Sequence, residues 1–392
     1  MKVLALSSGT SADGIDVALA ELSDQDGVAT MRPLAYREED WPARQREEIL
    51  AAMPPAPIDA VQLCRLDTGI GQTFADVAAR AVADWAAADV IVSHGQTLAH
   101  WTEGAAALGT LQLGSPAWIA AATGTPVVSD LRTADIAHGG HGAPLASTLD
   151  GLWLADRPTA AVNIGGIANL TIVGDGRVRT GDTGPGNCLI DAVMQAEHQA
   201  PYDAGGVLAA TGQVQPQALE TLLADEFYTH PLPRSTGRET FDSGYVARTL
   251  AAAGVPMPQG ADLIATLTEL TAATIAAVIA TEGAGRVVVS GGGAFNPTLL
   301  ARLGHHLPDH QVLTSTELGL PVQAKEGFLF ALLGYLAARG LPGTIPAGPP
   351  PAPQATGSAV PVILGSLTPP APAPCPPAAT AVHTLRLEEG SL

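Results

Sequence analysis

The sequence predicts a two-domain α/β protein that holds a ligand between its halves. Three glycine-rich turns, each directly after a strand-like apolar run, carry this prediction: residues 8–16, 181–187 and 290–296. A meander of short strands followed by such a turn appears at the N-terminus and starts again near Ala160, which suggests two related halves. The length of 392 residues also favours two domains over one.

Composition narrows the class of protein. Apolar residues make up 46% of the chain and charged residues 15%, which is enough apolar material for a large core. The net charge of -19 argues against a nucleic-acid partner and against an anionic membrane surface. The sequence shows no signal peptide and no uninterrupted apolar run long enough for a membrane span, and three scattered cysteines suit a reducing compartment, so we expect a cytoplasmic protein.

Lysine is nearly absent, since only Lys2 and Lys325 occur. A Walker A loop needs a lysine directly after its second glycine, and neither lysine has that context. The sequence therefore excludes a P-loop NTPase and argues against a protein kinase.

The elements follow from apolar periodicity. In the first half we expect strands at 3–6, 15–22, 29–36, 90–92 and 126–130, and helices at 41–53 and 61–88. In the second half we expect strands at 160–164, 169–173, 177–180 and 286–290, and helices at 215–226, 262–281 and 325–339. The predicted domains are 1–155 and 156–366, followed by a proline- and alanine-rich, poorly ordered tail at 367–392; the last helix can pack back on the first domain.

The turn at 181–187 carries the most chemistry. Its small side chains let a phosphate approach backbone N–H groups, and Asn187 stands where the N-cap of the following helix is expected. Asp182 is the acid nearest that anion and can hold a metal or take a proton from a nucleophile. A plain structural turn is the weaker interpretation, because it rarely needs three glycines and a proline.

The other two turns fit a nucleotide. The first, from Gly9 to Asp16, has two hydroxyls and two acids, more than a hairpin needs, so we expect it to face ATP phosphates with an acid toward Mg²⁺. The third, 290–296, is placed to hold an adenosine, although glycine turns of this kind often serve packing alone. Histidines His94, His100, His138 and His141 lack the spacing of a zinc site, and we predict no protein-held metal centre.

Arginines lie in two polar loops of this acidic chain. Arg132 belongs to the first loop, and Arg234 and Arg238 belong to the second. Surface salt bridges would explain them, but arginines within glycine-rich loops more often meet a carboxylate or phosphate.

Taken together, these motifs resemble those of the anhydro-N-acetylmuramic acid kinases, in the actin/sugar-kinase/Hsp70 superfamily. The resemblance runs from about residue 5 to about residue 365 and rests on the motifs at 8–16, 93–97, 130–137, 139–145, 163–170, 182–187, 235–239, 265–268, 291–297 and 325–326. The sequence departs from the usual family pattern at Ser7, Leu131, His141, Arg234 and Gly327. His141 puts the fine shape of the sugar site in question.

The resemblance implies an actin-like ATPase fold, also called ribonuclease H-like, with a nucleotide cleft between the domains. It implies a kinase that uses ATP, Mg²⁺ and water to open 1,6-anhydro-N-acetylmuramic acid and phosphorylate its O6, in peptidoglycan recycling. It also implies small-molecule partners and a homodimer.

Carried over residue by residue, the resemblance makes Asp182 the catalytic base that activates water. The implied ATP contacts are Gly9, Thr10, Ser11, Ala12, Asp13, Gly14, Ile15, Asp16, Gly165, Gly184, Gly291, Gly292, Gly293 and Asn296. The implied sugar contacts are His94, Gln96, Arg132, Asp135, Gly142, Ala143 and Glu326.

Two alternatives stay open. A kinase for another sugar or amino sugar on the same fold would phosphorylate a hydroxyl without opening a ring. A non-sugar actin-like ATPase would hydrolyse ATP without a sugar product, although the chain lacks a long insertion for binding polymers or peptides.

Overall fold

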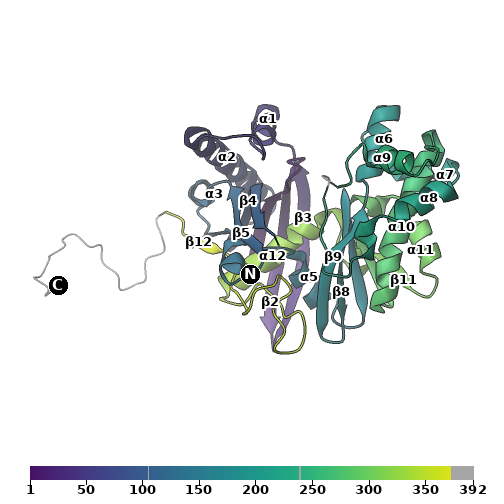
Figure 1. The fold of residues 1–392 in the computed structure, drawn as a ribbon. Helices are drawn as coiled ribbons and strands as arrows, with labels where there is room; N and C mark the ends of the chain where they lie inside the picture. Colours follow the sequence, from purple (N-terminus) through teal and green to yellow (C-terminus); the bar gives the residue numbers. More distant parts are fainter. Residues whose placement is uncertain (105, 238–239, 372–392) are drawn as a thin grey trace, which may run out of the picture.

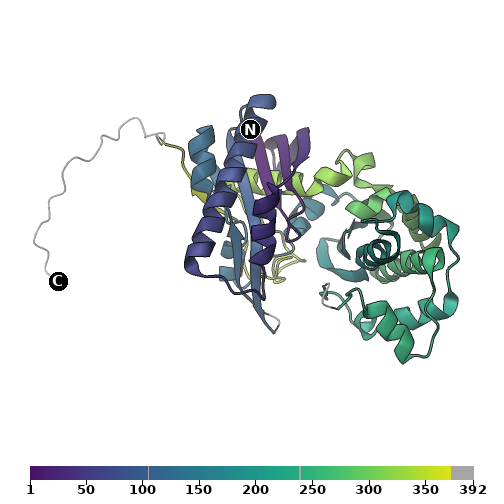
Figure 2. The ribbon, with the colours of Figure 1, turned by 90° about the horizontal axis from the view of Figure 1, so that it is seen from above.

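The computed structural model describes residues 1–104, 106–237 and 240–371. Its chain forms two halves, each built on one β-sheet, that lie side by side (Figures 1 and 2). The expected Arg238 and residues 372–392 of the expected tail lie outside the described residues.

The first sheet has seven strands, with the order β12-β6-β4-β1-β2-β3 and β5 paired to β4. β1 pairs antiparallel with β2 and parallel with β4, and β4 pairs parallel with β6. The strands are β1 (Lys2–Ser8), β2 (Ile15–Gln25), β3 (Val28–Glu39), β4 (Val90–Glu103), β5 (Ala106–Leu113), β6 (Val127–Ser129) and β12 (Ser366–Thr368). Residues 367 and 368, which we expected in the tail, therefore belong to this sheet.

The second sheet repeats this plan with five strands in the order β11-β10-β7-β8-β9. β7, β8 and β9 form an antiparallel meander, and β10 pairs parallel with both β7 and β11. The strands are β7 (Thr159–Ile164), β8 (Ile167–Gly174), β9 (Arg177–Pro185), β10 (Arg286–Ser290) and β11 (Gln311–Thr314). A meander followed by parallel strands in both halves confirms the predicted two related halves and the actin-like, ribonuclease H-like fold.

Helices cover both faces of the first sheet because its central strands are apolar on both sides. Leu4 and Leu6 of β1 pack with α2 and α3, whereas Val3 and Ala5 face α12. The helices of this half are α1 (Ala43–Ala51), α2 (Ala60–Asp84), α3 (Pro116–Thr123), α4 (Thr133–Ala137), α5 (Ala146–Trp153) and α12 (Lys325–Ala338). α12 contacts β1, β2 and β4, so the chain returns to the first sheet after completing the second.

The second half surrounds one long apolar helix, α10. This helix is long and apolar enough to cross a membrane, but 78% of its most apolar window is buried among its neighbours in the protein. The helices of this half are α6 (Cys188–His198), α7 (Val207–Thr211), α8 (Pro216–Leu223), α9 (Tyr245–Ala252), α10 (Gly260–Glu282) and α11 (Pro297–His306).

Candidate active site

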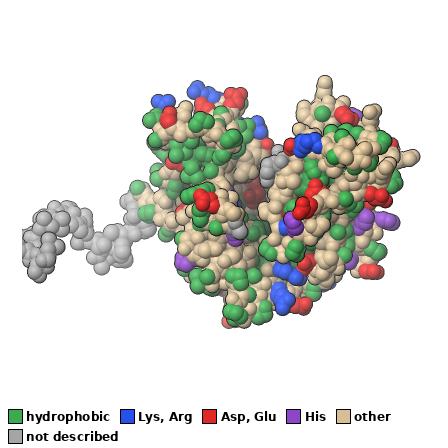
Figure 3. Space-filling model, in the orientation of Figure 1, with side chains coloured by type: hydrophobic (Ala, Val, Ile, Leu, Met, Phe, Trp, Pro, Cys, Tyr) green, Lys and Arg blue, Asp and Glu red, His purple; other side chains and the backbone are tan. Residues whose placement is uncertain are grey.

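A groove separates the two halves and opens at the top of Figure 3. The turn between β1 and β2 belongs to one half and the end of β9 to the other. Further predicted site residues follow β6 and β10, whereas Asp182 lies near the end of β9, which pairs antiparallel with β8.

In the first half, a chain of hydrogen bonds links four predicted sugar contacts. His94 is buried and its Nε2 lies 3.0 Å from Arg132 Nε, while Arg132 Nη1 donates to the Gly142 carbonyl at 2.6 Å. The Gly142 amide donates to Asp135 Oδ2 at 2.7 Å, and Thr356 Oγ1 donates to Asp135 Oδ1 at 2.6 Å. Ala143 follows Gly142 in the same loop. The sequence segments 94–96, 132–143 and 356 therefore form one unit.

This arrangement changes the interpretation of Asp135. Its side chain is 0% exposed and both of its oxygens accept hydrogen bonds from the protein. Asp135 therefore holds the 139–143 loop in place, and its role as a sugar contact stays a prediction.

His94 is held neutral by its surroundings. Burial, together with the nearby Arg132 charge, lowers the pKa of His94 to about 3. Its ring packs against Phe330 of α12, with ring centroids 4.4 Å apart. A neutral imidazole beside a guanidinium can accept its N–H, which fits the 3.0 Å contact.

The charges of Asp16 and Arg132 both act on the carboxylate of Glu326. Asp16 lies at the start of β2 and accepts a hydrogen bond from the Tyr36 hydroxyl at 2.6 Å. Glu326 lies at the start of α12 and is an exposed residue. Desolvation by the surrounding protein, followed by the Asp16 charge, nevertheless raises the pKa of its carboxyl. The Arg132 charge acts in the opposite direction and lowers this pKa. Desolvation likewise raises the pKa of Asp16. The site therefore concentrates negative charge beside one cation.

Most residues of the first glycine turn are exposed to solvent, and the turn is held in place by a hydrogen bond from β4. Gly9, Thr10, Ser11 and Asp13 are exposed, whereas Ala12 is buried with a φ of 49°. Gln96, predicted as a sugar contact, is buried and its Nε2 donates to the Gly9 carbonyl at 2.8 Å. Gln96 therefore ties the turn to β4, and the exposed hydroxyls and amides remain available to an anion.

A pocket of about 420 Å³ lies beside His94. Its lining is rich in hydroxyl and acidic side chains and includes Asp67, Ser93, Gln112, Ser129 and Asp130. Ser93 Oγ is buried without a hydrogen-bond partner in the described structure. Such a lining suits a hydroxylated ligand.

In the second half, Asp182 lies on a strand, since β9 continues to Pro185 where we expected a loop. Its Oδ2 accepts the Thr236 amide at 2.8 Å and the Ser235 hydroxyl at 3.2 Å. These donors orient the carboxylate. The side chain is half-buried, as a base that meets a water molecule needs to be.

Arg234 holds β9 in place through hydrogen bonds to main-chain carbonyls. Its guanidinium donates to the main-chain carbonyls of Asp182 at 2.9 Å, Tyr228 at 3.0 Å and His230 at 2.7 Å. The expected role of Arg234 as an anion ligand is therefore replaced by a structural one.

Asn187 is the N-cap residue of α6, as predicted, although its side chain makes no cap hydrogen bond. Its Nδ2 donates instead to the Ile164 carbonyl at 3.2 Å, and its amide donates to Gly165 O at 2.8 Å. The end of β9 is thereby joined to the turn between β7 and β8. Gly184 in this segment is buried, and a Cβ there would meet the Tyr228 ring at 2.8 Å.

The third glycine turn packs on the same corner. Gly291 has a φ of +79° and a Cβ there would lie 2.6 Å from Asn163 Oδ1, while Gly293 packs on Ile164. Gly292 is exposed, and a Cβ there would lie 3.7 Å from Asn187 Nδ2, which is an ordinary contact distance. Asn296 is buried and caps α11 by accepting the Leu299 amide at 2.9 Å. It shapes the loop and does not present its side chain.

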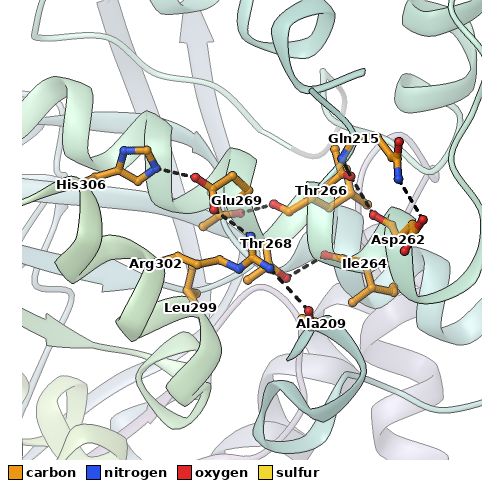
Figure 4. A network of polar contacts seen from close by, with 12 residues as sticks. Ala209, Gln215, Asp262, Ile264, Thr266, Thr268, Glu269, Leu299, Arg302 and His306 are labelled. Carbon is orange, nitrogen blue, oxygen red and sulfur yellow. Dashed lines mark hydrogen bonds and ion pairs between the residues drawn. The ribbon is translucent and has the colours of Figure 1, made fainter. Parts of the chain in front are cut away.

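A polar network fixes α11 behind this loop (Figure 4). Glu269 of α10 pairs with Arg302 at 2.8 Å and with His306 at 2.6 Å, and Arg302 reaches the Ala209 carbonyl. The helix that starts at the loop is therefore anchored to α10 and α7.

Sequence reasoning missed two residues of the site, Tyr36 and Phe330, because they read as ordinary apolar positions of a strand and a helix. Thr356 belongs to a Thr-Gly-Ser element, 356–358, that stands among prolines where the family usually has Thr-Gly-Ala. Gly357 of this element lies beside His141, since a Cβ on Gly357 would be 2.9 Å from the His141 ring. Within the described ranges, no three His, Cys, Asp or Glu side chains gather to hold a metal ion.

Comparison with known proteins agrees with this geometry. A family model described as anhydro-N-acetylmuramic acid kinase matches residues 1–370. The chain is 48% identical over 376 residues to the anhydro-N-acetylmuramic acid kinase of Streptomyces coelicolor, with 94% of each chain covered. It is 45% identical to that of Rhodococcus erythropolis, again with 94% of each covered, and 39% identical to that of Synechococcus elongatus, with 94% and 99% covered.

Among solved structures, a ROK hexokinase from Thermus thermophilus is 17% identical, with 87% of this chain and 100% of that chain covered and a TM-score of 0.36. An activator of 2-hydroxyisocaproyl-CoA dehydratase from Clostridium difficile with bound ADPNP is 10% identical, with 87% and 96% covered and a TM-score of 0.41. Because the family model spans nearly the whole chain and the sequence relatives are this similar, the chain belongs to the anhydro-N-acetylmuramic acid kinase family and is a kinase.

Proposed function

We propose that this kinase converts 1,6-anhydro-N-acetylmuramic acid, ATP and water into N-acetylmuramic acid 6-phosphate and ADP. The observation that supports it best is the Asp182 carboxylate, which Thr236 and Ser235 orient at the end of β9 in a chain whose residues 1–370 match this family.

In this reaction Asp182 takes a proton from a water molecule whose oxygen bonds to the anomeric carbon. The bond between that carbon and O6 breaks, and O6 bonds to the γ-phosphorus as the bond from phosphorus to ADP breaks. A positioned base of this kind contributes about 10²- to 10⁴-fold in rate. Closure of the groove would exclude other water.

ATP lies between the two halves in this proposal. The exposed turn from Gly9 to Gly14 receives the phosphates and the exposed Gly292 backbone flanks the adenosine. Mg²⁺ bound to these phosphates would neutralise part of their charge. Asp16 is the acid that would meet it, directly or through water.

The sugar lies beside His94, Arg132 and Glu326. Its lactyl group carries a carboxylate, for which Arg132 is the matching cation, since its guanidinium is the positive charge near this acidic pair. The hydroxyl-rich pocket beside His94 provides room for the polar ring substituents.

We also propose that the protein works in the cytoplasm as a homodimer. The net charge of -19 disfavours nucleic acid and anionic membranes as partners. Light scattering coupled to size exclusion tests the dimer, and a monomeric mass would contradict it.

The test is ADP release from the purified protein with Mg²⁺ and ATP. The sugars 1,6-anhydro-N-acetylmuramic acid, N-acetylmuramic acid, N-acetylglucosamine and glucose are added in turn, and the product mass is measured. We expect turnover with the anhydro sugar only, with a product that has gained both water and phosphate. Turnover with an open sugar would point to another sugar kinase, and sugar-independent hydrolysis would point to a non-sugar ATPase.

A further inference from the structure

Lys325 and Asp150 form an ion pair inside the protein, next to the candidate sugar site. Lys325 Nζ lies 2.7 Å from Asp150 Oδ1, and their side chains are 12% and 3% exposed. Lys325 is the first residue of α12 and Asp150 belongs to α5. The pair therefore joins two helices, and Glu326 is the next residue along the chain.

The local physics of the helix does not explain this lysine. A helix N-terminus carries partial positive charge, so a cation at the first position is unfavourable there. Burying an ion pair also costs desolvation energy that often cancels its attraction, so such pairs are weak contributors to stability. Lys325 is one of only two lysines in 392 residues. Neither of these effects favours a buried lysine at this position, so stability alone does not account for Lys325.

The chain is restrained on the other side of Glu326 as well. A Cβ on Gly327 would lie 2.7 Å from the Cβ of Ala18 on β2, so α12 begins in direct contact with this strand. Ala18 is two residues beyond Asp16. Glu326 thus stands between an ion pair and a tight backbone contact.

We propose that Lys325 and Asp150 are positioning residues that hold the first turn of α12, and through it Glu326, against the sugar side of the groove. The inference rests on the proposed function, which makes Glu326 a sugar contact. The pair acts through geometry, because Lys325 Nζ is engaged by Asp150 Oδ1 of α5 at 2.7 Å and thereby fixes the start of α12.

The test uses Lys325→Met and Asp150→Asn. Misplacing a group by about 1 Å can cost about 10²-fold in rate, so we expect kcat to fall about 10- to 100-fold. KM for ATP and the Kd for ADP are expected to change much less than kcat, because the proposed phosphate turn precedes Asp16 and is tied to β4 through Gln96. Lys325→Arg keeps the charge pair and is expected to recover most of the rate.

Two controls separate positioning from general destabilisation. Arg286→Met removes a buried cation that bonds Asp156 and Thr159 at the start of β10, away from the strand ends that form the site. We expect it to lower Tm while kcat is kept. The double variant Lys325→Met with Asp150→Leu leaves no buried charge and is expected to regain Tm while turnover stays low.

A double-mutant cycle with Glu326→Gln identifies the route of the effect. If Lys325 acts through Glu326, adding Lys325→Met to Glu326→Gln lowers kcat by less than twofold, because the group being positioned is already lost. Additive losses, or Lys325→Met with wild-type kcat, would overturn the inference. The assay uses whichever sugar the wild type phosphorylates, so failure with the anhydro sugar rejects the proposed function alone.

Discussion

Single residues at this site owe their roles to the strands that carry them. Asp182 pairs with Asn169 in the register of β8 and β9, and the following segment folds back to donate Thr236 N–H to its carboxylate. The sequence motif predicted the acid, but the donors were beyond prediction because residue 236 is 54 positions away.

Asp182→Asn is expected to abolish phosphorylation, with a loss of about 10³-fold or more, because an amide cannot take a proton from water. ADP binding by calorimetry is expected to be unchanged. Asp175→Asn, the same exchange at the exposed turn of this hairpin, is the control and should keep wild-type turnover. Retained turnover in the Asp182 variant would refute the base role.

The protonation of His94 links the site to stability. In the unfolded chain a histidine binds a proton below about pH 6.5, whereas folded His94 stays neutral down to about pH 3. Its contribution is therefore complete above pH 6.5 and is lost as the pH falls toward 3. Between pH 7 and 5.5 the wild type should lose about 1 kcal/mol more unfolding free energy than His94→Gln. Urea titrations at both pH values measure this, and equal losses would contradict the neutral, buried state.

Polar residues in glycine turns were predictable at this scale, and aromatic ones were not. The acids and hydroxyls at 8–16 stand out because ordinary turns do not need them. Tyr36 and Phe330 look like core residues, and only the packing of β3 and α12 beside β2 and β4 brings them to Asp16 and His94.

At the scale of elements, glycine turns let strand ends meet. Gly291 combines a left-handed φ of +79° with a position 2.8 Å from the Ile164 carbonyl for any added Cβ. The strands on either side were predicted correctly because their apolar runs are short and bounded by glycine. β5 and α5 were not predicted, since only Ala107 and Leu113 of β5 are buried and α5 has mixed composition.

Gly291→Ala is expected to raise KM for ATP about tenfold and to lower stability by about 1 to 3 kcal/mol, through backbone strain and the clash with β7. Gly319→Ala is the matched control, because its φ is +87° but no atom lies within 4 Å of the added Cβ. This variant should lose only the stability that the strained backbone costs, and its KM for ATP should stay at the wild-type value. Equal effects of both exchanges on KM would show that the contact with β7 is unimportant.

At the scale of the whole molecule, the two sheets share one strand order, but the first half is discontinuous in sequence. The apolar face of β1 formed by Val3 and Ala5 is covered by α12, which begins more than 300 residues later. The repeated meander predicted that the chain has two related halves. The packing of α12 on the first sheet depends on long-range contacts, and apolar periodicity does not specify those contacts.

Residues 1–155 alone are therefore expected to lack a stable fold, because one face of their sheet stays bare. Adding residues 325–371 in the same chain through a flexible linker should restore cooperative unfolding, measured by circular dichroism and thermal melting. Cooperative unfolding of residues 1–155 without that segment would contradict the assigned packing.

The late position of α12 in the sequence also determines the order in which the two halves can fold during synthesis. Chains fold as they leave the ribosome, N-terminal parts first where they can. Here the first sheet must wait with an uncovered apolar face until α12 emerges, while the second sheet and α10 and α11 are already complete. The N-terminal half is thus the last to mature, and during synthesis it is the part of the nascent chain most in need of a chaperone.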